Sequence, residues 1–186
     1  ATNVAINVLN QVIEASSLTL ESVDLPSGES VINLSLADFE LSLNNGSDPL
    51  VMVSVGTANL IVNSEGMGLR VTGGSVTTGS LPAGVSLEAS DAKVVLNTTS
   101  GVLDLGGGEA LQAGPYLRIE LPGATLTVAG IGVSGGIVFD QETDEEGGTI
   151  TRVAVADAGL TVDGERVARA DGALVLLPAT TTNSGG

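Results

Sequence analysis

The sequence predicts an all-β protein in which long, bulged antiparallel strands form a meander. Three observations predict it: apolar and polar residues alternate over most of the chain, the phase of the alternation flips at recurring places, and short Gly-containing turns separate the alternating stretches. Alternation places successive side chains on opposite faces of a strand, and two-residue turns join antiparallel strands. These strands are expected to build an elongated sheet that is rolled or forms two layers.

Each phase flip predicts a bulge or bend in the middle of one long strand. Around Asp38, the apolar set changes from Leu34 and Leu36 to Phe39 and Leu41. A one-residue slip would expose the second set, and a β-bulge returns it to the inner face. The residues predicted to lie at strand bends are Asp38, Asp91, Gly123 and Asp157. The carboxylates of the three aspartates, with Asp171 as a further candidate, are expected to accept backbone N–H bonds freed by the bulge, and a ladder of metal sites is the alternative.

The elements follow from the same pattern in chain order. The alternating stretches are 18–21, 32–43, 51–62, 68–76, 85–96, 102–108, 117–128, 132–137, 153–162 and 172–176. Asn45-Gly46 and Asp163-Gly164 are strong hairpin signals, and Ala129-Gly130 is a weaker one. The best helix candidate, Val8 to Ala15, fits a strand equally well, so about ten to twelve strands and at most one short helix are expected. A β-solenoid is the alternative architecture, because the bends recur about every 16 or 17 residues.

Residues 18–62 resemble residues 137–176. Leu18 to Leu43 aligns without gaps to Ile137 to Val162 at an offset of 119, and Ala58 to Val62 resembles Gly172 to Leu176 at an offset of 114. The whole chain, 1–186, is therefore predicted to be one elongated β-repeat region with about one and a half copies of a unit of roughly 115–120 residues. A partial second copy is expected of a piece from a longer tandem array.

Composition excludes several classes of function. The chain has 22 Asp and Glu against 6 Lys and Arg, a net charge of -16, one Lys, and no His or Cys. The common general base, the Ser-His triads, most zinc sites and disulfides are therefore missing, and we expect no enzyme. The negative charge repels phosphate backbones, so no nucleic-acid partner is expected. No apolar run approaches the roughly 18 residues of a spanning helix, so no transmembrane segment is predicted.

The acidic turn near residue 143 is the candidate metal site. Its carboxylates belong to Asp140, Glu142, Asp144, Glu145 and Glu146. Hard oxygen ligands suit Ca²⁺, but the spacing fits neither an EF-hand loop nor a glycine-rich nonapeptide repeat. A solvated acidic hairpin is the alternative, and no other cofactor is expected. Lipid on an open Leu/Val/Ile face is a further alternative, although the many inward Ala and Gly positions favour close packing of two faces.

The motifs Asn97-Thr98-Thr99, Ala113 to Ile119, Leu126 to Gly130, Phe139-Asp140-Gln141 and Arg152 to Asp157 occur in this order. Together they resemble a tandem β-rich repeat of very large bacterial secreted or cell-surface proteins, which are adhesin-like. The resemblance covers roughly residues 50 to 177 and departs at the Gly-rich segment Val102 to Gln112.

The resemblance implies an extracellular or cell-surface setting and a structural or adhesive module, such as a building block or spacer of a fibre, stalk or layer. The expected partners are neighbouring repeats or identical subunits, joined through β-edges. Calcium-dependent adhesion and binding of an apolar ligand are the alternative functions.

Overall fold

The computed structural model describes residues 1–9, 11–24, 28, 30–45, 48–79, 83–106, 108–143, 149–162 and 165–176. In these ranges the chain forms thirteen strands and no helix. The strands are β1 (Thr2–Val8), β2 (Gln11–Asp24), β3 (Ser30–Asn45), β4 (Asp48–Val62), β5 (Met67–Thr78), β6 (Val85–Glu88), β7 (Ala92–Asn97), β8 (Leu103–Gly106), β9 (Glu109–Leu111), β10 (Tyr116–Val128), β11 (Ile131–Thr143), β12 (Thr149–Val162) and β13 (Glu165–Leu176). Over the same ranges, no helix has the length and apolar character needed to cross a membrane.

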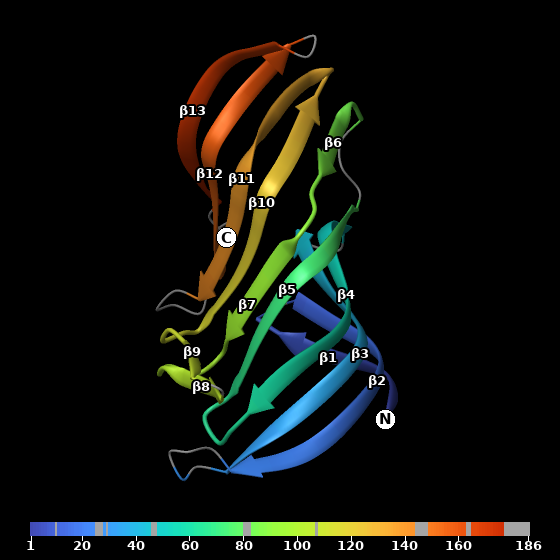
Figure 1. Ribbon diagram of the computed structural model, residues 1–186, viewed down its shortest axis with the longest axis vertical. Helices are drawn as coiled ribbons and strands as arrows, with labels where there is room; N and C mark the ends of the chain where they lie inside the picture. Colours follow the sequence, from blue (N-terminus) through green and yellow to red (C-terminus); the bar gives the residue numbers. More distant parts are fainter. Residues whose placement is uncertain are drawn as a thin grey trace, which may run out of the picture.

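Eleven of the strands form one sheet (Figure 1). Ten of them follow the order β1-β2-β3-β4-β5-β7-β10-β11-β12-β13, and β6 lies beside β10. Every described pair is antiparallel. The predicted all-β meander is confirmed, and the solenoid alternative is not what the chain forms, because its coils do not reverse direction.

Two segments raise the strand number above the predicted range. The stretch 85–96 divides into β6 and β7 at Asp91, although both parts pair with β10 as one long strand would. The Gly-rich segment that departs from the resemblance forms the small β8–β9 hairpin, which is outside the main sheet. An added Cβ on Gly68 would lie 2.3 Å from the Leu103 side chain, so glycine lets this hairpin pack on β5.

The first strands curl under the sheet and bury their inner face (Figure 1). Val8, Ile13 and Leu41 meet side chains of β5, β7 and β10 across a common core. The facing residues are Leu69, Val94, Leu96 and Leu117. Phe39, which follows the flip at Asp38, is fully buried. We call this part, β1 to β5 with β7 and the first half of β10, the closed half.

The later strands have no such cover over much of their inner face. Ile131 is 47% exposed, and Val133 and Leu160 are half-buried. Near the start of β2 the closed half also reaches this region, where the Gln11 amide donates to the Gln141 side-chain oxygen at 3.2 Å. We call β11, β12, β13 and the second half of β10 the open half.

The bends lie in left-handed backbone at the three predicted aspartates. The φ angles of Asp38, Asp91 and Asp157 are 48°, 57° and 54°. Asp tolerates this region better than most residues, since its short polar side chain bonds locally. The pairing of β10 with β11 shifts between Leu121 and Ala124, the interval that contains Gly123.

The two similar segments pair in the same register. Ala37 pairs with Ser17 in β3 and β2, and Ala156 pairs with Gly136 in β12 and β11, both at an offset of 119. The next strand pairs, β3 with β4 and β12 with β13, also correspond. Leu36 pairs with Ala58 and Val155 pairs with Gly172, and Gly172 lies at the offset of 114 from Ala58. The likeness therefore extends from side-chain type to strand pairing.

Candidate functional site

A polar groove of about 640 Å³ lies on the outer face of the sheet. Its floor is one row of cross-strand partners, in which Arg70 pairs with Val95, Val95 with Arg118, Arg118 with Asp140, and Asp140 with Arg152. Side chains of one such row point to the same face. The β9 end and the loop from Gln112 to Pro115 form the wall.

The charges of this row are paired with one another. Arg118 donates to both oxygens of Asp140, at 2.7 and 2.8 Å, and Arg152 lies 2.5 Å from Glu142. Arg70 and Glu109 are 3.5 Å apart, which links the β8–β9 hairpin to the sheet. The hydrogen bonds that Arg118 donates to Asp140 raise the pKa of Arg118, and the bond that Arg152 donates to Glu142 raises the pKa of Arg152. Both guanidinium groups therefore remain charged at ordinary pH.

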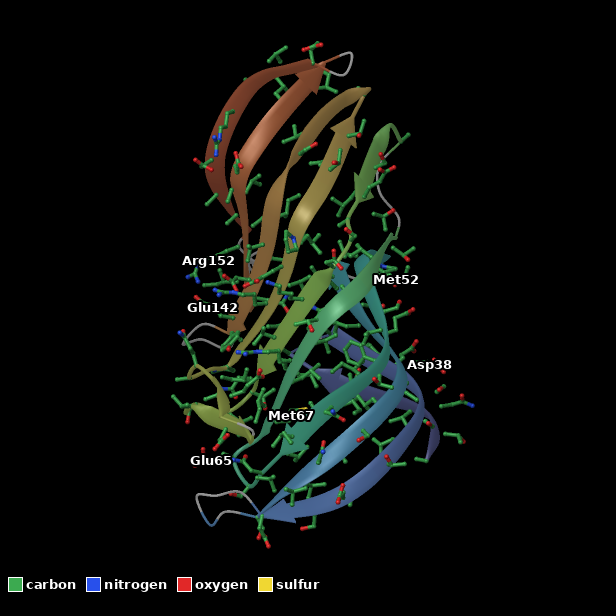
Figure 2. The ribbon with its side chains drawn as sticks, viewed as in Figure 1. Asp38, Met52, Glu65, Met67, Glu142 and Arg152 are labelled. Atoms are coloured by element: carbon green, nitrogen blue, oxygen red, sulfur yellow. The ribbon has the colours of Figure 1, made fainter. Side chains whose placement is uncertain are left out.

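These pairs bear on the predicted calcium site. Figure 2 shows Glu142 and Arg152 together at one side of the sheet, far from Asp38. Asp140 and Glu142 already face cations, and a bound Ca²⁺ would have to displace those cations or share the carboxylates with them. Asp144, Glu145 and Glu146 lie outside the described residues. Within the described ranges, no group of three or more acidic side chains could hold a metal ion.

The groove is polar and nearly balanced in charge. Arg70, Arg118 and Arg152 face Glu120, Asp140 and Glu142 along its lining, with Tyr116 as the one aromatic residue. Balanced pairs attract neither a phosphate nor a cation strongly, because each charge already has a partner. The arrangement offers hydrogen bonds to a polar surface and no nucleophile with an adjacent base.

The bend aspartates stand on separate strands and do not form a common site. Asp38 accepts a 2.7 Å hydrogen bond from the Ser16 hydroxyl of β2. At the equivalent bend the backbone N–H of Asp157 donates to Asp171 of β13 at 2.6 Å, and Asp157 also pairs with Arg169. At this bend the N–H of Asp157 therefore donates to the carboxylate of Asp171 on the neighbouring strand. The carboxylate of Asp157 itself pairs with Arg169.

The sequence did not identify the most buried polar hub. Asn97 is fully buried, and its amide donates to the carbonyls of Gly101 and Gln112 at 2.9 and 2.7 Å. Its oxygen accepts from the N–H and hydroxyl of Thr99, both at 2.9 Å. This network fixes the loop that carries β8 and β9 beside the groove. Asn97 and Thr99 of the Asn97-Thr98-Thr99 motif are buried in the folded chain, and the motif by itself does not indicate this burial.

The described sheet ends in two edges. β1 pairs with β2 and β13 pairs with β12, and neither strand has a second neighbour among the described residues. β1 pairs with β2 only as far as Ser17, so the second half of β2 pairs with β3 alone among the described strands, apart from two bonds between Ala1 and Leu18. Exposed edges offer unpaired N–H and C=O groups to another strand.

Comparison with protein-family models, with curated proteins and with solved structures finds no match to this chain. The candidate sites are therefore the groove and the two sheet edges, as the residues themselves define them.

Proposed function

We propose that this chain is a structural module of an extracellular assembly, a building block or spacer in a fibre, stalk or surface layer. One observation carries the proposal: the same strand pairing recurs at the two ends of a single open sheet, at offsets of 119 and 114 residues. Repeating units that extend one structure end to end are typical of solenoid and array proteins.

The distribution of charge supports the proposal. Arg70, Lys93, Arg118, Arg152 and Arg169 each pair with an Asp or Glu, so the cations stiffen the outer face and leave a strongly negative surface. Such a surface keeps the chains soluble and resists non-specific contacts between sheet faces. Contacts along the sheet edges remain available, because main-chain hydrogen bonds do not depend on net charge.

Negative-stain imaging and mass photometry over a concentration series test the proposal. Linear particles that lengthen with concentration, at a salt concentration that screens the net charge, are the expected result. A compact monomer at every concentration and salt level would contradict it. The parallel measurement with EGTA separates a calcium-dependent assembly, because chelation would then dissolve the particles.

A further inference from the structure

The two sheet edges have chain directions that let them pair with each other. The path from β1 to β13 contains ten antiparallel strands, an even number, so along the sheet β1 and β13 have opposite chain directions. A second copy that continues the sheet beyond β13 with its inner face on the same side therefore brings its β1 antiparallel to β13 of the first.

The heights of the two strands also agree. In the closed half, β1 is level with the first half of β4. Ile6 of β1 pairs with Ile13 of β2, Ile13 pairs with Leu41 of β3, and Leu41 pairs with Val53 of β4. The counterpart of β4 is β13, in which Ala168 pairs with Leu160. β1 of a second copy thus faces the first half of β13, from Glu165 onward.

The closed half shows that this edge position accepts a strand. The outer edge of β4 pairs with β5 through Val53 and Val76, and through Leu60 and Leu69. The corresponding edge of β13 has no described partner. Ala168, level with Leu160, is exposed, whereas Val53 at the equivalent place in β4 is fully buried.

Use of both edges favours the unlike pairing. β1 carries no charged side chain, and β13 carries Glu165 and Asp171 beside Arg166 and Arg169, so side-chain charge opposes no pairing of these edges. Pairing β13 with itself would leave both β1 edges bare, whereas head-to-tail contact uses both edges of every chain.

We infer that β13 of one chain pairs antiparallel with β1 of a second copy, and that repetition of this heterologous contact extends the sheet head to tail. The inference rests on the proposed function and specifies its partner and its contact. Its main-chain bonds set the direction, and the apolar inner positions Val4, Ile6 and Ala168 continue the inner face across the junction.

Cross-linking of single-cysteine chains tests the contact, since the natural chain has no Cys. Ala5→Cys and Val167→Cys place thiols on exposed residues of β1 and β13, and Thr72→Cys places one on an exposed residue of central β5 as a control. Chains with different tags are mixed and treated with a short bis-maleimide. The mixed Ala5–Val167 product is expected to exceed the statistical mixture and the Thr72 background.

The other outcomes separate the two proposals. Excess Val167–Val167 product together with assembly would overturn the head-to-tail contact and retain the structural module. Products at the Thr72 background, without particles in the stain, would overturn both. Circular dichroism of each variant verifies that the sheet has formed.

Discussion

The closed and open halves contain the same strand pairings in different surroundings. Leu41 is 2% exposed in the closed half, and its counterpart Leu160 is half-buried; Ile13 is 1% exposed, and its counterpart Val133 is half-buried. The strands differ little in pattern, so the difference arises from the layer opposite them. The alternation of apolar and polar residues decides which side chains point inward. The curl of β1 to β4 decides which of these inward side chains are buried.

The largest expected contrast is between Leu41→Ala and Leu160→Ala. The first removes a fully covered side chain and is expected to cost about 2–5 kcal/mol in the free energy of unfolding. The second removes partly hydrated surface and is expected to cost less than about half as much, because less transfer energy is lost. Urea unfolding of both variants measures the difference. Equal costs would show that the open half is covered in solution.

The next largest effect on stability is expected at Gly114, whose backbone lies against the backbone of Asn97. A Cβ on Gly114 would lie 2.4 Å from the Asn97 carbonyl oxygen, so Gly114→Ala is expected to destabilise the fold by about 1–3 kcal/mol. Gly123→Ala is the control, since nothing lies within 4 Å of its Cβ position. Thermal unfolding of the pair compares them, and a stable Gly114→Ala chain would mean that the Asn97 loop relaxes easily.

The bends compare the halves at equivalent positions. Asp38→Val and Asp157→Val put a β-branched residue into left-handed backbone and are each expected to cost about 1–2 kcal/mol. Asp38→Gly and Asp157→Gly remove that strain and are expected to restore most of the stability despite the lost side-chain bonds. Unfolding free energies of the four chains test this. Valine variants as stable as the glycine variants would contradict left-handed bends.

The outer-face ion pairs give the smallest effects. Arg118→Gln breaks a bidentate, half-exposed pair and is expected to cost up to about 1 kcal/mol, whereas Arg169→Gln, on the exposed edge, is expected to change little. The hydrogen bond to Asp140 raises the pKa of Arg118 in the folded state, so its contribution is present below the unfolded pKa and is lost only as pH rises through the folded pKa. Salt titration of unfolding measures both variants, and a larger loss for Arg169→Gln would contradict this order.

Much of the fold was predictable, because it depends on local chemistry. The flip at Asp38 and the turn at Ala129-Gly130 are local, and both turn residues have the positive φ of a tight hairpin, at 50° and 84°. The groove was not predictable in the same way. Arg70 and Arg152 are 82 positions apart in the chain, and only the register of five strands puts them in one row.

The acidic candidates show the same limit. The sequence groups Asp140 with Glu142 because they are near in the chain, and the sheet sets Arg118 and Arg152 opposite them. Asn97 belonged to a motif and not to a predicted site, since its role depends on the loop of Gly101 and Gln112 that folds around it. Partners across strands are invisible to a reading along one strand.

The sequence by itself determined the strands, their bends and the similarity of residues 18–62 to residues 137–176, because side-chain alternation and turn residues act over a few positions. Only the tertiary structure decided that the first of these segments lies in the closed half and the second in the open half, because burial depends on the curl that sets Leu41 against Leu69. The two edges also follow from tertiary structure. Pairing of ten strands in one path gives β1 and β13 opposite chain directions along the sheet and leaves each with one partner strand within the described residues.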